Sequence, residues 1–495
     1  MARRSGTLEL VLGPRADGQS AQGWVYEGLR AAILDGRLRA GARLPATRDL
    51  AHQHGLARGT VVAAFTQLQA EGYVRSTVGS GTVVGAVPPD ALLGVERWRP
   101  RRRPSPTPSR PVHLSRFARR VKSFPVLEAR RTHAFRTDLP ALELFPATLW
   151  TQVTGRVMRR ASTRLLLGCE PLGHRPLREA VAAHLRAARG ARCEAEQVAI
   201  VSGVQEALDL AARLLVDPGD RVCLEDPGYG GAARAFGAVG ARLVPVPVDS
   251  EGLVVDPARL RGARLVYSTP AHQYPLGVTM SIARRLALLR WARASGAVLF
   301  EDDYDGEFRY QGRPIPSLQG LESDAPVLLA GSFGKVLFPA LRLGYLVLPG
   351  ELVERVAALR SATVRHPPVP EQAVLTAFIE EGHLGRHVRR MREVYAERRA
   401  ALVEAAERLL SERLLLSPVE AGLQTSGLLG SGFRAEAVVR AAAEKGVEVS
   451  TLGREWQGRF RREGLQLGFA AVPPEEIRRG VDVLARVLDR TASPG

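Results

Sequence analysis

The stretch GSFGKVLFPALRLGY, residues 331–345, contains Lys335, one of three lysines in a chain of 495 residues. The chain takes nearly all of its positive charge from arginine, so a lysine here points to chemistry that arginine does not offer. A lysine amine can lose its proton and attack an aldehyde, whereas a guanidinium stays protonated at neutral pH. Lys122 and Lys445 are interpreted as ordinary surface charges, but the apolar residues 336–338 argue against full exposure of Lys335. The sequence therefore predicts an imine-forming lysine.

Short apolar runs alternate with helical stretches on both sides of this lysine. From about residue 126 onward, seven runs are typical of buried strands: QVAIVSG, DRVCLED, ARLVPVP, ARLVYSTP, AVLFEDD, PVLLAGS and GYLVLPG. Strand–helix alternation of this kind predicts an α/β fold with a mostly parallel sheet that helices cover on both faces. Residues after about 380 are expected to form a second, smaller α+β portion. The large part is placed at about 170–375 and the small part at about 380–495.

Three further motifs supply what a pyridoxal 5'-phosphate (PLP) site needs, namely a carboxylate for the pyridinium nitrogen, an aromatic plate and phosphate donors. FEDDYDGEF ends a predicted strand and offers Asp302 and Tyr304, while EDPGYGG offers Tyr229 for stacking. SGVQEAL opens a predicted helix, so the backbone N–H groups of Gly203, Val204 and Gln205 can hold a phosphate. Arg342 can add a forked contact to the same phosphate. Each motif alone is common, since acidic strand ends also bind metals or nothing, but together they predict a PLP site.

The first quarter of the chain is strongly basic. The chain carries a net charge of +18; residues 1–85 contain ten Arg against six acidic residues, and residues 86–125 contain nine Arg and one Lys against two acidic residues. Arginine preference across a genome would explain the residue type but not this clustering. The asymmetry predicts a polyanionic partner, with nucleic acid favoured.

Residues 22–84 are predicted to form a helix, a helix–turn–helix and a two-stranded wing. The second helix of such a motif presents its first turn to DNA bases, while flanking groups contact phosphates. Candidate DNA-binding residues are therefore Arg48, Arg58 and Thr60, with Gly79 and Ser80 in the wing. The string LPATRDLAHQHGLARGTVVAAFTQLQAEGYVRSTVGSGTVV resembles the winged helix–turn–helix of GntR regulators. Ala46 and Ala57 stand where that family often has Ser, so weaker helix capping is expected.

Residues 86–125, which include RPRRRPSPTPSRP, are predicted to be a flexible Arg/Pro-rich linker, because proline excludes helix interiors and the charge opposes packing. The alternative is a loop of the following domain. The expected organisation is a DNA-binding domain at 1–85, the linker at 86–125, and a PLP-binding domain at 126–495.

The C-terminal part resembles fold-type I aminotransferases over nearly all of residues 130–490. Its motifs, among them T-P-x-H-Q-x-P-x-G, E-D-D-Y-D-x-E-F and G-S-F-x-K-x-L-F-P-x-L-R-L-G-Y, are similar to those of the MocR subfamily, GntR-type regulators with an aminotransferase-like effector domain. The resemblance implies that Lys335 forms the imine, that Asp302 meets the pyridine nitrogen, and that Tyr304 lies near the ring hydroxyl. It further implies stacking by Tyr229, phosphate contacts from Ser332, Arg342 and residues 203–205, and a pocket lined by His272 and Gln273. A homodimer is also implied.

Several residues depart from the pattern of working aminotransferases. Gln466 stands where an arginine holds the substrate carboxylate, Gly231 replaces an arginine of one amino-acid-sensing relative, and Tyr274 replaces an asparagine. Gly334 replaces a frequent serine, and residues 165–170 lack a frequent tyrosine. Loss of an ion-pair anchor weakens substrate positioning more than cofactor binding.

We therefore expect a cytoplasmic transcription regulator that binds an operator in double-stranded DNA and a small-molecule effector. The effector is either PLP itself or an amine or amino acid that displaces Lys335. Two alternatives are a competent aminotransferase with a DNA-binding head and a DNA-binding scaffold with an empty pocket. The sequence contains no apolar run long enough to span a membrane, no secretory signal and no cysteine spacing typical of a metal site. No metal is expected.

Overall fold

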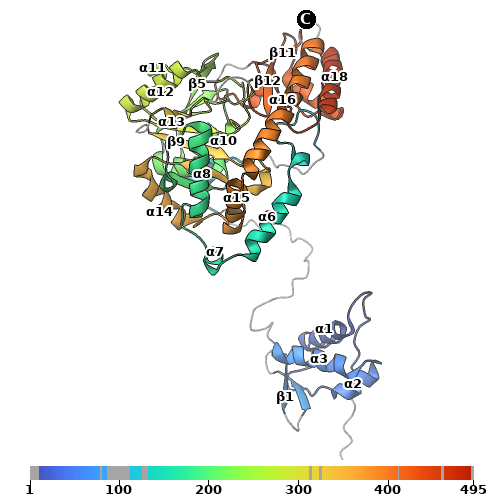
Figure 1. Ribbon diagram of the computed structural model, residues 1–495. Helices are drawn as coiled ribbons and strands as arrows, with labels where there is room; N and C mark the ends of the chain where they lie inside the picture. The colour runs from blue at the N-terminus through green and yellow to red at the C-terminus, as the bar shows by residue number, and fades with distance from the viewer. Residues whose placement is uncertain are drawn as a thin grey trace, which may run out of the picture. The chain divides into compact units, whose positions relative to one another are not determined.

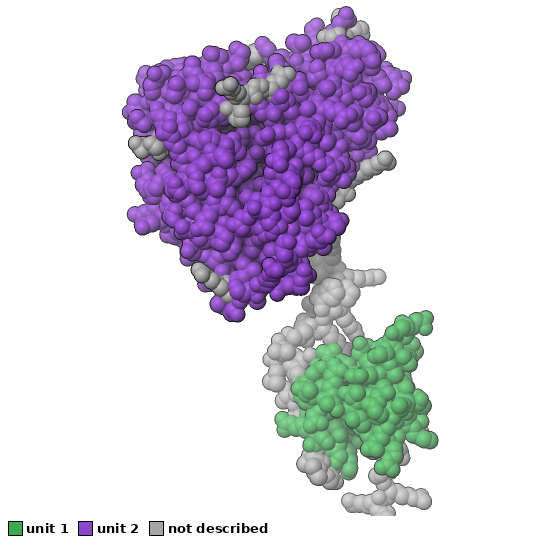
Figure 2. Space-filling view, in the orientation of Figure 1, with its two compact units in different colours: residues 1–112 green, residues 113–495 purple. Residues whose placement is uncertain are grey.

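The computed structural model describes residues 10–77, 81–85, 112–124, 132–310, 315–322, 326–410, 412–458 and 462–491. The chain divides into two compact units, residues 1–112 and 113–495, which Figure 2 shows in different colours. Most of the expected linker, and the wing residues Gly79 and Ser80, lie outside the described residues. No described helix is long and apolar enough to cross a membrane.

Within residues 10–77 and 81–85, the first unit has three helices and a hairpin, as the sequence predicts (Figure 1). The helices are α1 (Ala21–Leu34), α2 (Thr47–Gln53) and α3 (Arg58–Ala70), and the strands are β1 (Val74–Thr77) and β2 (Gly81–Val84). Val25, Leu29, Val61 and Leu68 are fully buried at the centre of this unit. Each such side chain stabilises the folded state by about 1.5–3 kcal/mol, so the unit has a core of its own.

A short segment, residues 112–124, precedes the main body of the second unit. It contains α5 (Arg116–Arg120), which begins at Ser115, whose side chain accepts a hydrogen bond from the Ala118 N–H. The segment lies against α10 (Gly230–Val239): the guanidinium of Arg234 is 4.6 Å from the centre of the Phe124 ring. The guanidinium of Arg213, on α9 (Val204–Leu215), is 5.5 Å from the centre of the Phe117 ring. This part of the expected linker is thus helical and in contact with the second unit.

An eight-stranded mixed sheet organises the second unit, with strand order β3-β10-β9-β8-β7-β4-β5-β6 among the described residues. Seven of these strands are the ones predicted from the apolar runs, and β6 (Gly252–Leu253) is an additional strand at the edge. The bounds of the seven are β3 (Val198–Val201), β4 (Arg221–Asp226), β5 (Arg242–Asp249), β7 (Ala263–Ser268), β8 (Val298–Asp303), β9 (Val327–Ser332) and β10 (Gly344–Val347). The neighbours β5, β4, β7, β8 and β9 are parallel, whereas β10 is antiparallel to both β3 and β9. The predicted α/β fold with a mostly parallel sheet is confirmed.

Both faces of this sheet are buried, because side chains alternate along each strand. On β10, Tyr345 and Val347 belong to one apolar cluster, and Leu346 belongs to the cluster on the other face. Helices α9, α10 and α14 (Val353–Thr363) contribute to the second cluster. Helices α8 (Arg175–Arg189), α12 (Ile282–Ser295) and α15 (Val369–Glu380) supply apolar side chains to clusters on the first face. Other helices in the described part of this unit are α6 (Ala147–Arg159), α7 (Thr163–Leu167), α11 (Pro257–Leu260) and α13 (Leu318–Leu321).

The predicted smaller α+β portion follows the 27-residue helix α16 (His383–Leu409). Its antiparallel sheet has the order β11-β12-β14-β13, formed by β11 (Leu414–Leu416), β12 (Gln424–Leu429), β14 (Gly464–Gly468) and β13 (Ser450–Thr451). Helices α17 (Ala435–Glu444) and α18 (Pro474–Thr491) contact each other, and α18 also contacts α16 (Figure 1). Parallel strands β4, β7, β8 and β9 end at one edge of the large sheet, so the polar residues at their ends meet there.

Candidate functional site

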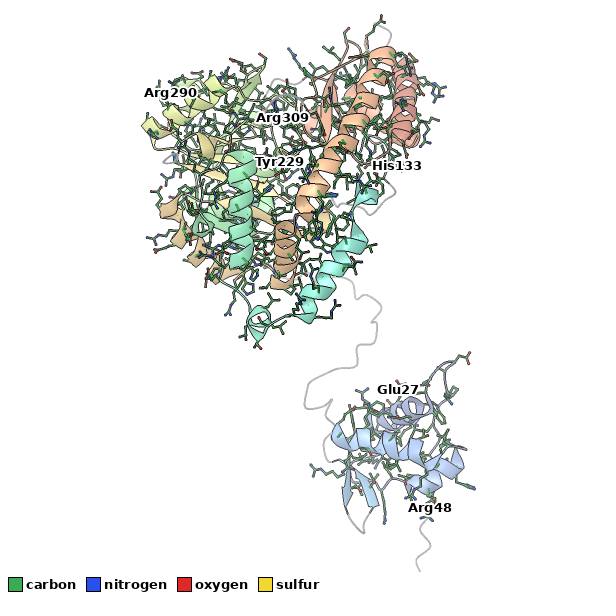
Figure 3. All side chains as sticks on the ribbon, in the orientation of Figure 1. Glu27, Arg48, His133, Tyr229, Arg290 and Arg309 are labelled. Carbon is green, nitrogen blue, oxygen red and sulfur yellow. The ribbon has the colours of Figure 1, made fainter. Side chains whose placement is uncertain are left out.

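The strand ends bring Asp302, Tyr304 and Lys335 together. Asp302 lies at the end of β8, Tyr304 follows that strand directly, and Lys335 lies in the turn after β9, the parallel neighbour of β8. The Lys335 Nζ atom is 5.3 Å from the centre of the Tyr304 ring. Tyr229, labelled in Figure 3, comes from another strand end, at the N-cap of α10. Residues up to 106 positions apart in the sequence therefore share one site.

Asp302 is a buried carboxylate with one oxygen left unused. Its Oδ2 atom accepts a hydrogen bond of 2.8 Å from the Tyr267 hydroxyl, while Oδ1 is buried without a partner among the described residues. Burial raises the pKa of Asp302 to about 7, against the opposing effects of the Tyr267 hydrogen bond and the Lys335 charge. An unpaired buried acceptor is costly unless a donor meets it. Oδ1 fits the ring N–H of a protonated pyridine.

The start of α9 forms a cradle for an anion. Gly203 is the N-cap, with a left-handed φ of 110° and no side chain to cap the helix, so backbone N–H groups of the first turn stay available. Pairing of Gly344 with both Val201 and Ser332 brings the ends of β3 and β9 beside each other. A Cβ atom on Gly203 would lie 3.5 Å from Nη2 of Arg342. The Arg342 guanidinium therefore lies beside the start of α9, and these two groups together are suited to hold a phosphate.

Lys335 has a partner that sequence reasoning missed. Its amine forms an ion pair with the carboxylate of Asp138, which lies 197 positions away. Asp138 has a left-handed φ of 67°, and its backbone N–H donates to the Gln424 side chain at 3.0 Å. Because no motif surrounds Asp138 and its neighbours are loop residues, only the folded arrangement reveals this contact.

The expected pocket residues His272 and Gln273 have different surroundings. The buried His272 Nδ1 atom is 2.9 Å from the Tyr304 hydroxyl and 2.9 Å from an Asp305 carboxylate oxygen, so His272 fixes the orientation of Tyr304. The Gln273 amide instead donates to Glu225 at 3.1 Å and to two loop carbonyls. Gln273 therefore holds its own loop together and leaves no amide hydrogen for a ligand.

The side of the site that lies towards the small sheet is acidic. Tyr274 packs edge-on against both Tyr229 and Tyr304, with ring centres 5.7 and 5.9 Å apart. The Glu455 carboxyl group and the Gln466 amide, which is 2% exposed, both lie within hydrogen-bonding reach of its hydroxyl. Burial raises the pKa of Glu455 to about 7, and the negative charge of Asp138 adds to that rise.

In the first unit, Arg48 and Arg58 are exposed and Thr60 is half-buried. Arg58 and Thr60 lie in the first turn of α3, and Arg48 lies on α2 (Figure 3). Ala46 and Ala57 cap these two helices without a side-chain hydrogen bond, as expected from the sequence. Arg43, which the sequence did not single out, pairs with Val83 of the wing strand through a backbone bridge and adds another exposed cation beside it.

Both units match known families. Residues 22–84 match the model for bacterial regulatory proteins of the gntR family, and residues 148–484 match the model for aminotransferase class I and II. The chain is 38% identical to the probable rhizopine catabolism regulatory protein MocR of Rhizobium meliloti, with 95% of this chain and 94% of the relative covered.

The chain belongs to the MocR-type regulators of the GntR family. This MocR-type regulator is also 32% identical to the pyridoxine biosynthesis transcriptional regulator PdxR of Corynebacterium glutamicum, over 94% of each chain. Among solved structures, it is similar to LysN, the alpha-aminoadipate aminotransferase of Thermus thermophilus complexed with a phosphopyridoxyl-leucine (TM-score 0.70, 29% identity, 76% of this chain and 97% of that one). It is therefore a DNA-binding transcription regulator whose second unit has the fold-type I aminotransferase fold, and PLP is its expected cofactor.

Proposed function

We propose that this regulator holds PLP at Lys335 and changes its DNA binding when an amine reacts at that site, with little or no turnover. The observation that carries the proposal is the combination of the Lys335 amine, the unpaired Oδ1 of Asp302, and the Arg342 guanidinium beside Gly203 at the start of α9. These groups come from three segments of the chain, around residues 203, 302 and 331–345, and fit the amine-reactive, cationic and anionic parts of one cofactor. Bound PLP supplies an aldehyde that condenses with primary amines.

Each residue of the site has a defined task in this proposal. Asp302 accepts the hydrogen bond of the ring nitrogen and keeps that nitrogen protonated, and Tyr229 covers one face of the ring. Asp138 holds the Lys335 side chain beside Tyr304 through their ion pair. In this proposal, residues 1–85 bind DNA and residues 126–495 bind the ligand. We further propose that the protein acts as a cytoplasmic homodimer.

A competent aminotransferase is the second candidate, because Asp302, Tyr304 and Lys335 would suffice to hold the cofactor in an enzyme as well. The buried Gln466 argues against it, since a neutral amide replaces the cation that anchors a substrate carboxylate. An assay of the PLP-loaded protein across amino acids and keto acids separates the two. Steady formation of product would favour the enzyme.

The direct test of the proposed function is chemical trapping. Purified protein is loaded with PLP, reduced with borohydride, digested and examined by mass spectrometry. A phosphopyridoxyl adduct on Lys335 is the expected result, together with a visible absorption band before reduction. A colourless protein without an adduct would favour a DNA-binding scaffold with an empty pocket.

A further inference from the structure

Helix α3, the second helix of the helix–turn–helix motif, exposes an apolar side chain on its outer side. Val61 and Phe65 pack into the core of the first unit, whereas Val62 is 41% exposed. Gly59 and Thr66 are exposed as well, and they lie three and four positions from Val62, so the three residues share one side of the helix. This set, Gly59, Val62 and Thr66, is called the outer face of α3 below.

The packing of the described residues gives no reason for a glycine at position 59. Gly59 lies in the first turn of α3, its φ is outside the left-handed region, and a Cβ atom built on it would meet no described neighbour within 4 Å. Glycine destabilises a helix relative to alanine, because it loses more conformational freedom on folding. A glycine that costs stability without serving the packing favours a role in letting another molecule approach the backbone closely.

The outer face of α3 has little hydrogen-bonding capacity for a partner. The side chains of Gly59 and Val62 carry no donor or acceptor. The Thr66 hydroxyl donates a hydrogen bond of 2.9 Å to the Val62 carbonyl, so its hydrogen is used within the helix. This face is therefore better suited to an apolar group than to a polar base edge.

The charges around the outer face of α3 favour DNA as its partner. Arg58 is exposed directly before Gly59, and Arg48 is exposed on α2, which packs against α3 (Figure 3). Asp49, in the first turn of α2, is the acidic residue beside Arg48, and the first turn of α3 contains no acidic residue. A small apolar surface flanked by arginines matches the major groove, where phosphates border the base edges.

Thymine is the base that presents a methyl group in the major groove. We propose that Val62 contacts the 5-methyl group of a thymine in the operator, and that Gly59 lets the helix backbone approach closely enough for this contact. The inference rests on the proposal that residues 1–85 bind DNA, and it does not depend on the chemistry at Lys335. It makes Val62 a residue that sets sequence specificity.

The test replaces thymine by uracil, which lacks only the 5-methyl group. An operator is selected from a random DNA pool with the full-length protein, and each thymidine is then replaced in turn by deoxyuridine. Fluorescence anisotropy at one fixed salt concentration measures the affinities. At least one replacement is expected to weaken binding about three- to fourfold, the loss that corresponds to one buried methyl group.

Val62→Ala should remove this discrimination, because the shorter side chain no longer reaches the methyl group. The variant is expected to bind the thymidine and deoxyuridine operators with affinities within about twofold of each other. Leu415→Ala, which also shortens an exposed apolar side chain but lies on β11 of the second unit, is the control and should keep the full discrimination.

Gly59→Ala tests the close approach. Its added methyl group should weaken operator binding by obstructing the helix backbone, whereas hydrogen–deuterium exchange in α3 should become no faster, because alanine favours the helix. Operator binding as tight as that of the unchanged protein would refute the role of Gly59.

An operator in which no thymidine responds to deoxyuridine would overturn the inference, and so would a response that persists undiminished in Val62→Ala. Arg58→Ala separates this inference from the proposed function. If Arg58→Ala weakens operator binding while the deoxyuridine replacements have no effect, only the thymine contact is refuted. Failure of the protein to select any DNA sequence would overturn both.

Discussion

Lys335 is the residue on which the chemistry of the second unit depends. We expect Lys335→Ala to remove the visible absorption band of the PLP-loaded protein and the borohydride-trapped adduct, because alanine has no amine to condense with the aldehyde. DNA affinity in the absence of ligand should stay within about twofold, since Lys335 lies in the other compact unit. Absorption spectra and electrophoretic mobility shifts measure the two properties. Lys445→Ala is the matched control and should change neither; a loss of basal DNA affinity in Lys335→Ala would contradict the separation of roles.

Asp302 makes the stability of the cofactor-free protein depend on pH in a predictable way. Burial raises the pKa of Asp302 from 3.8 to about 7, so between these values the folded state holds a proton that the unfolded state has released. Stability therefore falls as pH rises through this window, by up to about 1.4 kcal/mol per pH unit. The substitution Asp302→Asn removes this pH-dependent contribution to the free energy of unfolding.

Urea unfolding of the cofactor-free protein and of Asp302→Asn at pH 5 and pH 8 measures the effect. Between pH 5 and pH 8, the free energy of unfolding of Asp302→Asn should rise by about 2–4 kcal/mol relative to that of the unchanged protein. The reason is that only the unchanged protein has to bury a charge at pH 8. A constant difference between the two proteins would show that Asp302 is not protonated at the lower pH.

Some residues of the site could be predicted from the sequence and others could not. Asp302, Tyr304 and Lys335 end strands or follow them closely, and parallel strands bring such positions to one edge, so local motifs suffice. Asp138 and Glu455 lie in loops, and their roles come from contacts across 197 and 225 residues. The sequence marked Gln466 as a missing anchor, but its burial beside Tyr274 follows from the folded sheet, which no local pattern encodes.

At the scale of elements, we predict that the first turn of α3 contacts DNA. Arg58→Ala should weaken binding to an operator selected from a random DNA pool by about 1–3 kcal/mol if the side chain reads a base, and relax selectivity at one position. The absorption band of the PLP-loaded protein should not change. Fluorescence anisotropy with the selected operator and with an unrelated duplex measures both effects, and the exposed Arg75 on the wing provides an Arg75→Ala comparison.

The segment 112–124 gives a second prediction at this scale. Phe124→Ala removes the contact with Arg234, worth about 0.5–2 kcal/mol, and should loosen the segment from α10. Hydrogen–deuterium exchange is then expected to rise in residues 113–124 and to stay unchanged in β8. Val112→Ala, an exposed change at the start of the segment, is the control. Equal exchange in Phe124→Ala and the unchanged protein would show that the ring contributes little to docking.

The sequence was less informative about how elements are oriented. Apolar runs predicted seven strands of the large sheet, because buried strands are rich in apolar residues whichever way they run. The composition of β10 does not reveal that the strand is antiparallel to its neighbours. The position of β10 nevertheless matters, because its residue Gly344 pairs with Val201 on one side and with Ser332 on the other. Helix α5 was also missed, because the surrounding charge suggested an unpacked chain, whereas two phenylalanines stack with arginines of α9 and α10.

At the scale of the whole molecule, two compact units of different fold share one chain, and the first carries more positive charge for its length. A ligand can couple the two units only if it binds one arrangement of the units more tightly than another. A ligand that binds both arrangements equally well does not shift the equilibrium between them. Arg234 links two parts of the second unit, since its charge acts on Glu455 and its guanidinium stacks on Phe124.

The separate core of the first unit has a practical consequence for engineering. Because Val25, Leu29, Val61 and Leu68 are buried within residues 10–85 alone, we expect that the DNA-binding domain can be exchanged for that of another regulator without rebuilding the second unit. A chimera joined within residues 86–111 would report the same chemical signal from a different promoter, which turns this protein into a starting point for biosensors.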